Sequence, residues 1–94
     1  MTSREAIQKF NGLIKFIDRL LKMLHGNVEF QKWHRRVVMT LRYAYPSRIK
    51  LFASIRFTLG RYYIAEEGWK AQRAYESGLH SAKSFLEVLV EEIT

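Results

Sequence analysis

The chain has 94 residues, of which 48% are hydrophobic, so it should fold as one small domain over residues 1–94 rather than persist as a disordered basic tail. It contains no cysteine, which excludes disulfides, thiolate metal sites and cysteine nucleophiles and is compatible with a cytoplasmic protein. Its formal net charge is +7. Residues 1–65 contain thirteen Lys and Arg residues and three acids, whereas residues 66–94 contain three Lys and Arg residues and six acids. This excess of positive charge favours a polyanionic partner.

Charged residues interrupt every long apolar stretch of the sequence. No segment offers the roughly 20 apolar residues that a membrane-spanning helix needs. The first residues, Met1 to Glu5, are not followed by the apolar run of a secretion signal. We therefore expect a soluble protein with no membrane partner.

The first predicted helix covers residues 3–25. Its apolar residues recur at steps of three and four from Ile7 to Leu24, which is the period of a helix with one buried face. Ser3 is the expected N-cap, and Gly26 with the following asparagine is the expected stop. Gly12 weakens the middle of this helix by about 1 kcal/mol relative to alanine, which suggests that another helix approaches closely there.

The second predicted helix covers residues 28–45 and ends before Pro46, which cannot continue a helix. The next segment is ambiguous, because residues 51–59 also alternate as in a strand. We expect a short helix leading into an extended turn, since a lone strand would leave its backbone groups unpaired. Residues 60–68 are expected to form a loop or the frayed start of a helix.

The last predicted helix shows the clearest pattern. Its apolar residues step by four and three in a heptad-like stripe. The predicted fold is therefore all-α: a small antiparallel helical bundle of three long helices plus one short helix. The stripe consists of Tyr75, Leu79, Ala82, Leu86, Leu89 and Ile93.

Two of the predicted helices carry cations away from their apolar stripes. These two faces either form one patch or are ordinary solvated surfaces. Few acids are available to neutralise them, although Asp18 and Lys22 are spaced for one helical ion pair. The cations are Lys15, Arg19 and Lys22 on the first helix, and Lys32, Arg35, Arg36 and Arg42 on the second.

A second group mixes cations with aromatic residues. Such a mixture suits a nucleotide or a single strand, because bases stack on rings while cations hold phosphates. Alternatively, the aromatic rings belong to the core and the arginine stems cover its edge. No nucleic-acid motif accompanies the group. It comprises Arg48, Lys50, Arg56 and Arg61 around Phe52, Phe57, Tyr62 and Tyr63.

The three histidines, His25, His34 and His80, fall on three different predicted helices without a metal-ligand spacing, so no metal site is expected. His34 lies next to Arg35, yet no placed partner makes it an acid–base catalyst. We therefore expect no enzymatic activity and no cofactor.

Aromatic, small and aliphatic positions from about Glu29 to Thr94 resemble a helical module found N-terminal to TIR-like nucleotide-binding domains of bacterial defence proteins. The resemblance implies a defence or phage counter-defence setting, in which small helical proteins assemble into oligomers and sense or sequester nucleotide signals. The chain ends where such proteins continue, so it would be a free-standing version or an excised domain. The resemblance carries no functional residues. The matching positions are Phe30, Trp33, Phe52 to Phe57, Tyr75 to Leu79, Ala82, Leu86 and Glu91 to Ile93.

The expected function is non-enzymatic capture of a phosphorylated ligand, either a nucleotide signal or a nucleic acid, by an oligomeric helical protein. The alternative is an interaction or oligomerisation module without a nucleotide ligand, in which the stripe of the last helix packs against another chain or the basic faces meet an acidic protein surface. The residues expected to hold phosphate are Lys32, Arg35, Arg36, Arg42, Arg48, Arg56 and Arg61, and those expected to stack on a base are Tyr62 and Tyr63.

Overall fold

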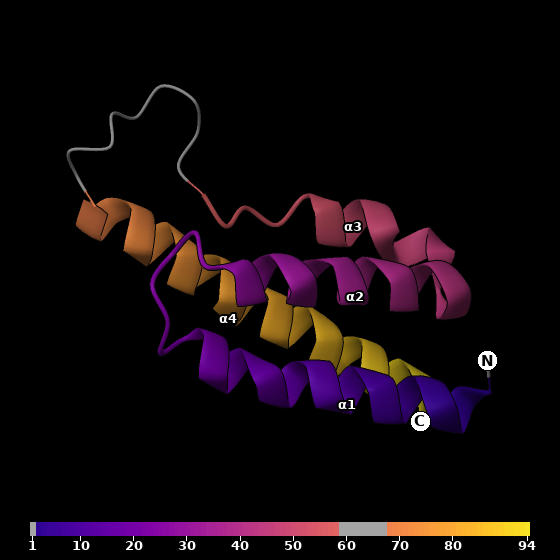
Figure 1. Ribbon diagram of the computed structural model, residues 1–94. Coiled ribbons are helices and arrows are strands. Elements are labelled where there is room, and N and C mark those ends of the chain that lie inside the picture. The colour runs from indigo at the N-terminus through magenta and orange to yellow at the C-terminus, as the bar shows by residue number, and fades with distance from the viewer. Residues whose placement is uncertain (1, 59–67) are drawn as a thin grey trace.

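The structure is a computed structural model that describes residues 2–58 and 68–94. All regular structure in these two ranges is helical, which confirms the all-α prediction. The elements are α1 (Ser3–Leu20), α2 (Val28–Ala44), a 3₁₀ turn η1 (Pro46–Arg48), α3 (Ile49–Ala53) and α4 (Gly68–Ile93) (Figure 1).

The three longer helices share one core. In Figure 1 the chain reverses direction between α1 and α2, and α1 contacts both α2 and α4. The predicted apolar stripes of α2 and α4 lie mostly on the faces that meet, because residues three and four apart lie on the same side of a helix. The predicted stripe of α1 is only partly correct. Leu24 lies beyond the end of α1 and is 76% exposed, and the buried face of that helix consists of Ala6, Phe10, Leu13, Ile17 and Leu20. Among the fully buried side chains are Phe10 and Ile17 of α1, Trp33 and Val37 of α2, and Leu79 and Leu86 of α4.

The stripe of the last helix is buried inside its own chain. From Tyr75 to Leu89, every member of the stripe is at most 2% exposed. The alternative in which this stripe packs against another chain is therefore wrong, since α1 of the same chain is its partner. Any contact with a second protein has to use other residues.

The connection between α1 and α2 is held by α4. The helix α1 ends at Leu20 rather than at His25, because the following residues bond to a side chain from α4. Gln72 accepts a hydrogen bond from the His25 backbone N–H at 2.7 Å and donates one to the Met23 carbonyl at 3.0 Å. Gly26 then turns the chain in the left-handed region, with φ of 79°.

Asn27 begins α2 and links it to the other two helices. Its side-chain oxygen accepts from the Phe30 backbone N–H at 2.7 Å, which is an N-cap bond. Its amide nitrogen donates to the Tyr75 hydroxyl at 3.0 Å, and that hydroxyl donates to the Leu20 carbonyl at 2.7 Å. Burial raises the pKa of the Tyr75 phenol, which stays a neutral donor. At the start of α1 the N-cap is Thr2 rather than Ser3, because the Thr2 hydroxyl accepts from the Glu5 N–H at 3.2 Å.

Replacing Tyr75 with phenylalanine should lower the free energy of unfolding by about 1–3 kcal/mol. The change keeps the buried ring and removes only the hydroxyl, which leaves the Asn27 amide and the Leu20 carbonyl without their shared partner. Urea unfolding followed by circular dichroism measures the loss. The control is Tyr43→Phe, because the Tyr43 side chain is 71% exposed, and equal stabilities of the two variants would contradict the role of the hydroxyl.

Close backbone approach occurs at Gly78, not at Gly12. A Cβ atom added at Gly12 would meet nothing within 4 Å, so the prediction of a close helix approach there is wrong. A Cβ atom at Gly78 would lie 2.5 Å from the Arg56 carbonyl oxygen and 2.9 Å from the Phe57 Cα. Gly78 therefore lets the chain after α3 lie directly against α4, where the Phe57 side chain enters the core at 7% exposure.

The ambiguous segment after Pro46 is helical at first. The 3₁₀ turn η1 and α3 carry the chain to Ala53, and Ile55 to Phe57 then follow without regular structure, so the predicted short helix is confirmed. The loop predicted over residues 60–68 lies outside the described residues, except that Gly68 is the first residue of α4.

Candidate functional site

The exposed side of α2 carries four of the predicted phosphate ligands, and we call it the basic face of α2. All four residues are exposed, whereas Trp33 and Val37 are buried in the core. No acid occurs between Phe30 and Ala44, so nothing within that part of the helix neutralises these cations. The basic face consists of Lys32, Arg35, Arg36 and Arg42.

Apolar side chains interrupt the basic face. Met39 is 48% exposed and Tyr43 is 71% exposed, although residues of their size are usually at least half buried. With Lys32 and Arg36 they follow one another at steps of four, three and four, so they form one line along the helix. Cations and an exposed aromatic ring therefore share one surface.

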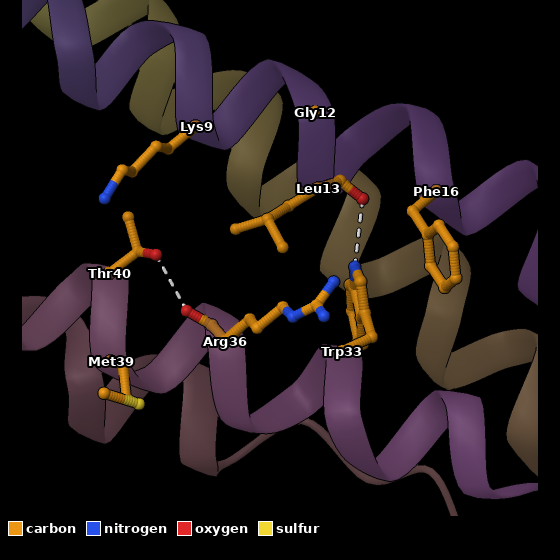
Figure 2. A pocket seen from close by; sticks show the side chains of 8 residues that line it. All are labelled: Lys9, Gly12, Leu13, Phe16, Trp33, Arg36, Met39 and Thr40. Atoms are coloured by element: carbon orange, nitrogen blue, oxygen red, sulfur yellow. Dashed lines mark hydrogen bonds between the residues drawn. The ribbon is translucent and has the colours of Figure 1, made fainter.

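A groove between α1 and α2 borders the basic face (Figure 2). Its volume is about 400 Å³. Leu13 and Trp33 form its floor, and the Trp33 indole N–H donates to the Leu13 carbonyl at 3.0 Å, which joins the two helices below the groove. The lining residues are Lys9, Gly12, Leu13 and Phe16 from α1 and Trp33, Arg36, Met39 and Thr40 from α2.

Cations lie at both ends of this groove. In Figure 2 the Lys9 side chain extends toward Thr40, whereas the Arg36 guanidinium points toward Trp33. In residues 2–58 and 68–94, no carboxylate lies within ion-pair distance of Lys9 or Arg36. Arg19 adds a third cation, since its guanidinium carbon lies 5.6 Å from the centre of the Phe16 ring. The groove is therefore an apolar surface bordered by positive charge that no carboxylate of the described residues neutralises.

The basic faces of the first two helices meet in part. Lys9 and Arg19 bring α1 charge to the groove, whereas Lys15 is exposed and does not line it. The predicted pair of Asp18 with Lys22 is wrong, because Lys22 follows the end of α1 and Asp18 instead pairs with Lys83 of α4 at 3.7 Å.

The members of the predicted group of arginines and aromatic rings that the structure describes do not form one site. Arg48 pairs with Glu92 at 2.7 Å, so its charge is neutralised within the chain. Arg56 is exposed, but its backbone lies against Gly78 on α4 and not beside the basic face. Phe52 is fully buried, which favours the alternative that these rings are core. Arg61, Tyr62 and Tyr63 lie outside the described residues.

His34 belongs to an aromatic cluster beside the core. Its ring centre lies 4.9 Å from that of Phe52 and 5.6 Å from that of Phe57. Burial among these rings lowers the pKa of His34, because it disfavours the charged imidazolium. Arg35 lies beside it along a shallow hollow. Within the described part of the chain, no three His, Asp or Glu side chains gather as metal ligands would.

Lowering the pH from about 7.5 to about 5.5 should destabilise the protein through His34. Folding holds the pKa of His34 below its ordinary value of 6.5, so the unfolded chain takes up the proton first. The stabilising contribution is complete above about pH 6.5 and is lost as the pH falls below that value. Urea unfolding should show a smaller pH dependence for His34→Gln than for the wild type. His80→Gln, at an exposed position on α4, is the control, and identical pH dependence of all three proteins would contradict the effect.

Of the eight residues that line the groove, only Arg36 was predicted from the sequence as a site residue. Lys9, Gly12, Phe16 and Met39 became site residues only when α1 and α2 were packed together. The α1 residues show a pattern in the sequence, since Lys9, Gly12 and Phe16 recur at steps of three and four beside the apolar stripe. This spacing alone does not distinguish a binding groove from the flank of an ordinary amphipathic helix.

In comparisons with protein-family models, curated proteins and solved structures, no match to this chain was found. Among the described residues, no helix combines the length and the apolar character that crossing a bilayer requires. The function therefore has to be inferred from the chemistry of the basic face and the groove.

Proposed function

We propose that this chain is a non-enzymatic protein that captures a phosphorylated ligand, a nucleotide signal or a nucleic acid, on the basic face of α2 and in the adjoining groove. The observation that carries the proposal is the run of Lys32, Arg35, Arg36 and Arg42 on one exposed helix face that holds no acid after Glu29. Unpaired cations on one face attract phosphates and release their counterions, which favours binding.

The ligand set in this proposal is smaller than the set predicted from the sequence. Arg48 is left out because Glu92 already neutralises it, and Arg56 because it lies on another part of the surface. Lys9 is added because it lines the groove together with Arg36. In this proposal the chain is an antiparallel bundle of three long helices and one short helix, and the protein acts in the cytoplasm. A role in phage defence or counter-defence rests only on the resemblance to defence proteins.

The proposal predicts salt-sensitive binding that depends on the basic face. Fluorescence anisotropy with a labelled DNA strand of about 12 nucleotides should show affinity falling steeply between about 50 and 200 mM salt. The triple variant Lys32→Ala, Arg35→Ala, Arg42→Ala should bind more weakly and reduce the magnitude of the slope of log K against log salt by about 2, because each phosphate contact to a single strand contributes about 0.7.

The matched control removes the same charge elsewhere. Arg4, Lys50 and Arg73 are exposed cations on α1, α3 and α4, and replacing all three with alanine also lowers the net charge by three. This control variant should keep the wild-type slope. Equal losses in the two triple variants would mean that only net charge matters, and no binding by the wild type would contradict the proposed function.

A second candidate function is assembly with another protein, including a second copy of the chain. It is favoured by a hollow between α3 and α4, with a volume of about 380 Å³. Leu51 is 54% exposed there and Val88 is 52% exposed, next to Ile55 and Phe85. Sedimentation of the wild type and of the Leu51→Ser, Val88→Ser variant tests this. A wild type that stays monomeric at every concentration argues against a homo-oligomer.

A further inference from the structure

We infer that the groove between α1 and α2 receives a nucleobase, so that the ligand is a base-bearing phosphate such as a single strand rather than a bare polyanion or a duplex. This inference rests on the proposed function and names its ligand class. The basic face of α2 would hold phosphates of any polyanion, whereas the groove would add a preference for an unpaired base.

The groove has the size and the chemistry for one base. Its volume of about 400 Å³ lies in the range of small-ligand sites. Phe16 and Met39 present apolar surface at its walls, above the buried Leu13 and Trp33. A flat, weakly polar ring covers such a surface well. Lys9 and Arg36 at the two ends can hold the phosphates on either side of the base.

Gly12 keeps the groove open. It lies on the α1 side of the groove, and a Cβ atom there would meet nothing within 4 Å. Helix packing does not require glycine at this position, because the space around it is open. Backbone conformation does not require it either, because Gly26 is the one residue of the described chain with a positive φ. Glycine in the middle of a helix is unfavourable by about 1 kcal/mol relative to alanine. A ligand that needs the space explains why a helix tolerates it.

The other hollows fit a nucleotide less well. In the hollow between α3 and α4, the cation is Arg48, which Glu92 already neutralises. In the hollow beside His34, Arg35 is the one Lys or Arg among the described lining residues, and the Phe57 ring there is 7% exposed. The groove between α1 and α2 combines two cations that pair with no carboxylate of the described residues with the partly exposed apolar side chains of Phe16 and Met39, which is the combination that a base and its phosphates need.

The experiment compares two labelled strands with the same number of phosphates. One carries bases over about 12 nucleotides, and the other is abasic over the same length. The wild type should bind the base-bearing strand about tenfold more tightly, in keeping with stacking of one base. Gly12→Leu should bring the two affinities together, because the added side chain fills the groove. Asn11→Leu is the matched control, since Asn11 is exposed on α1 and does not line the groove.

Each outcome is decisive. A preference for bases that is lost in Gly12→Leu and kept in Asn11→Leu supports the inference, provided that circular dichroism shows Gly12→Leu to be folded. Equal, salt-sensitive binding of both strands by the wild type overturns the inference and leaves the proposed function in place. No binding of either strand overturns both. Binding of an acidic amphipathic peptide, but of neither strand, with loss in Gly12→Leu, would assign the groove to a protein partner instead.

Discussion

Replacing Gly78 with alanine should lower the free energy of unfolding by about 1–3 kcal/mol, although only one methyl group is added. The new Cβ atom would stand 2.5 Å from both the Arg56 carbonyl oxygen and the Phe57 ring, and 2.9 Å from the Phe57 Cα. Two of these three atoms belong to the backbone, so relief requires the chain after α3 to move away from α4. The measurement is urea unfolding followed by helical circular dichroism.

Gly12→Ala is the matched control for this prediction. The same methyl group meets no atom within 4 Å there, so only helix propensity changes, and the free energy of unfolding should rise by up to about 1 kcal/mol. The two substitutions should therefore have opposite signs. Equal effects at both positions would show that the chain after α3 does not lie against Gly78.

Replacing Trp33 with alanine should lower the free energy of unfolding by about 3–5 kcal/mol, a large share of the stability of a domain of this size. Trp33 is 1% exposed and its ring centre lies 6.3 Å from those of Phe52 and Phe57. The substitution leaves a cavity where α2 meets these rings and removes the indole bond to the Leu13 carbonyl.

The second tryptophan supplies the control. Trp69 is 62% exposed near the start of α4, so Trp69→Ala should change the free energy of unfolding by less than about 0.5 kcal/mol. Trp33→Phe should fall between the two, because it keeps an aromatic ring in the core and loses mainly the hydrogen bond. Similar stabilities for Trp33→Ala and Trp69→Ala would contradict the placement of Trp33 in the core.

The helices and most of their buried faces could be predicted because the spacing of apolar residues within each segment determines them. Phe10, Ile17, Leu79 and Leu86 repeat with the period of a helix, and each was predicted to be buried before any partner was known. The end of α1 was predicted less well. Hydrogen bonds from Gln72, 49 residues beyond Met23, decide where that helix stops, and the sequence near Leu20 carries no sign of them.

The candidate site depends on contacts that the sequence does not reveal. Arg48 looked like a phosphate ligand because Glu92, its partner, lies 44 residues away. Gly12 and Gly78 are both helical glycines, and only the neighbouring backbone shows that Gly78 is the one under a close contact. The exposure of the basic face of α2 was predicted correctly, because the charge of each residue and the helical period determine which side of the helix faces solvent. These residues are Lys32, Arg35, Arg36 and Arg42.

The bonds that α4 makes to the connection between α1 and α2 also set the order in which the chain can fold. Tyr75 bonds to Leu20 across 55 residues, and Gln72 holds Met23 and His25 from a similar separation. Until Tyr75 has left the ribosome, the turn that reverses the chain lacks these bonds, and α1 lacks α4, which is one of the two long helices that it contacts. The apolar face of the first half of the protein therefore stays uncovered until the last helix has been synthesised. During that interval this half is most exposed to aggregation and to proteases.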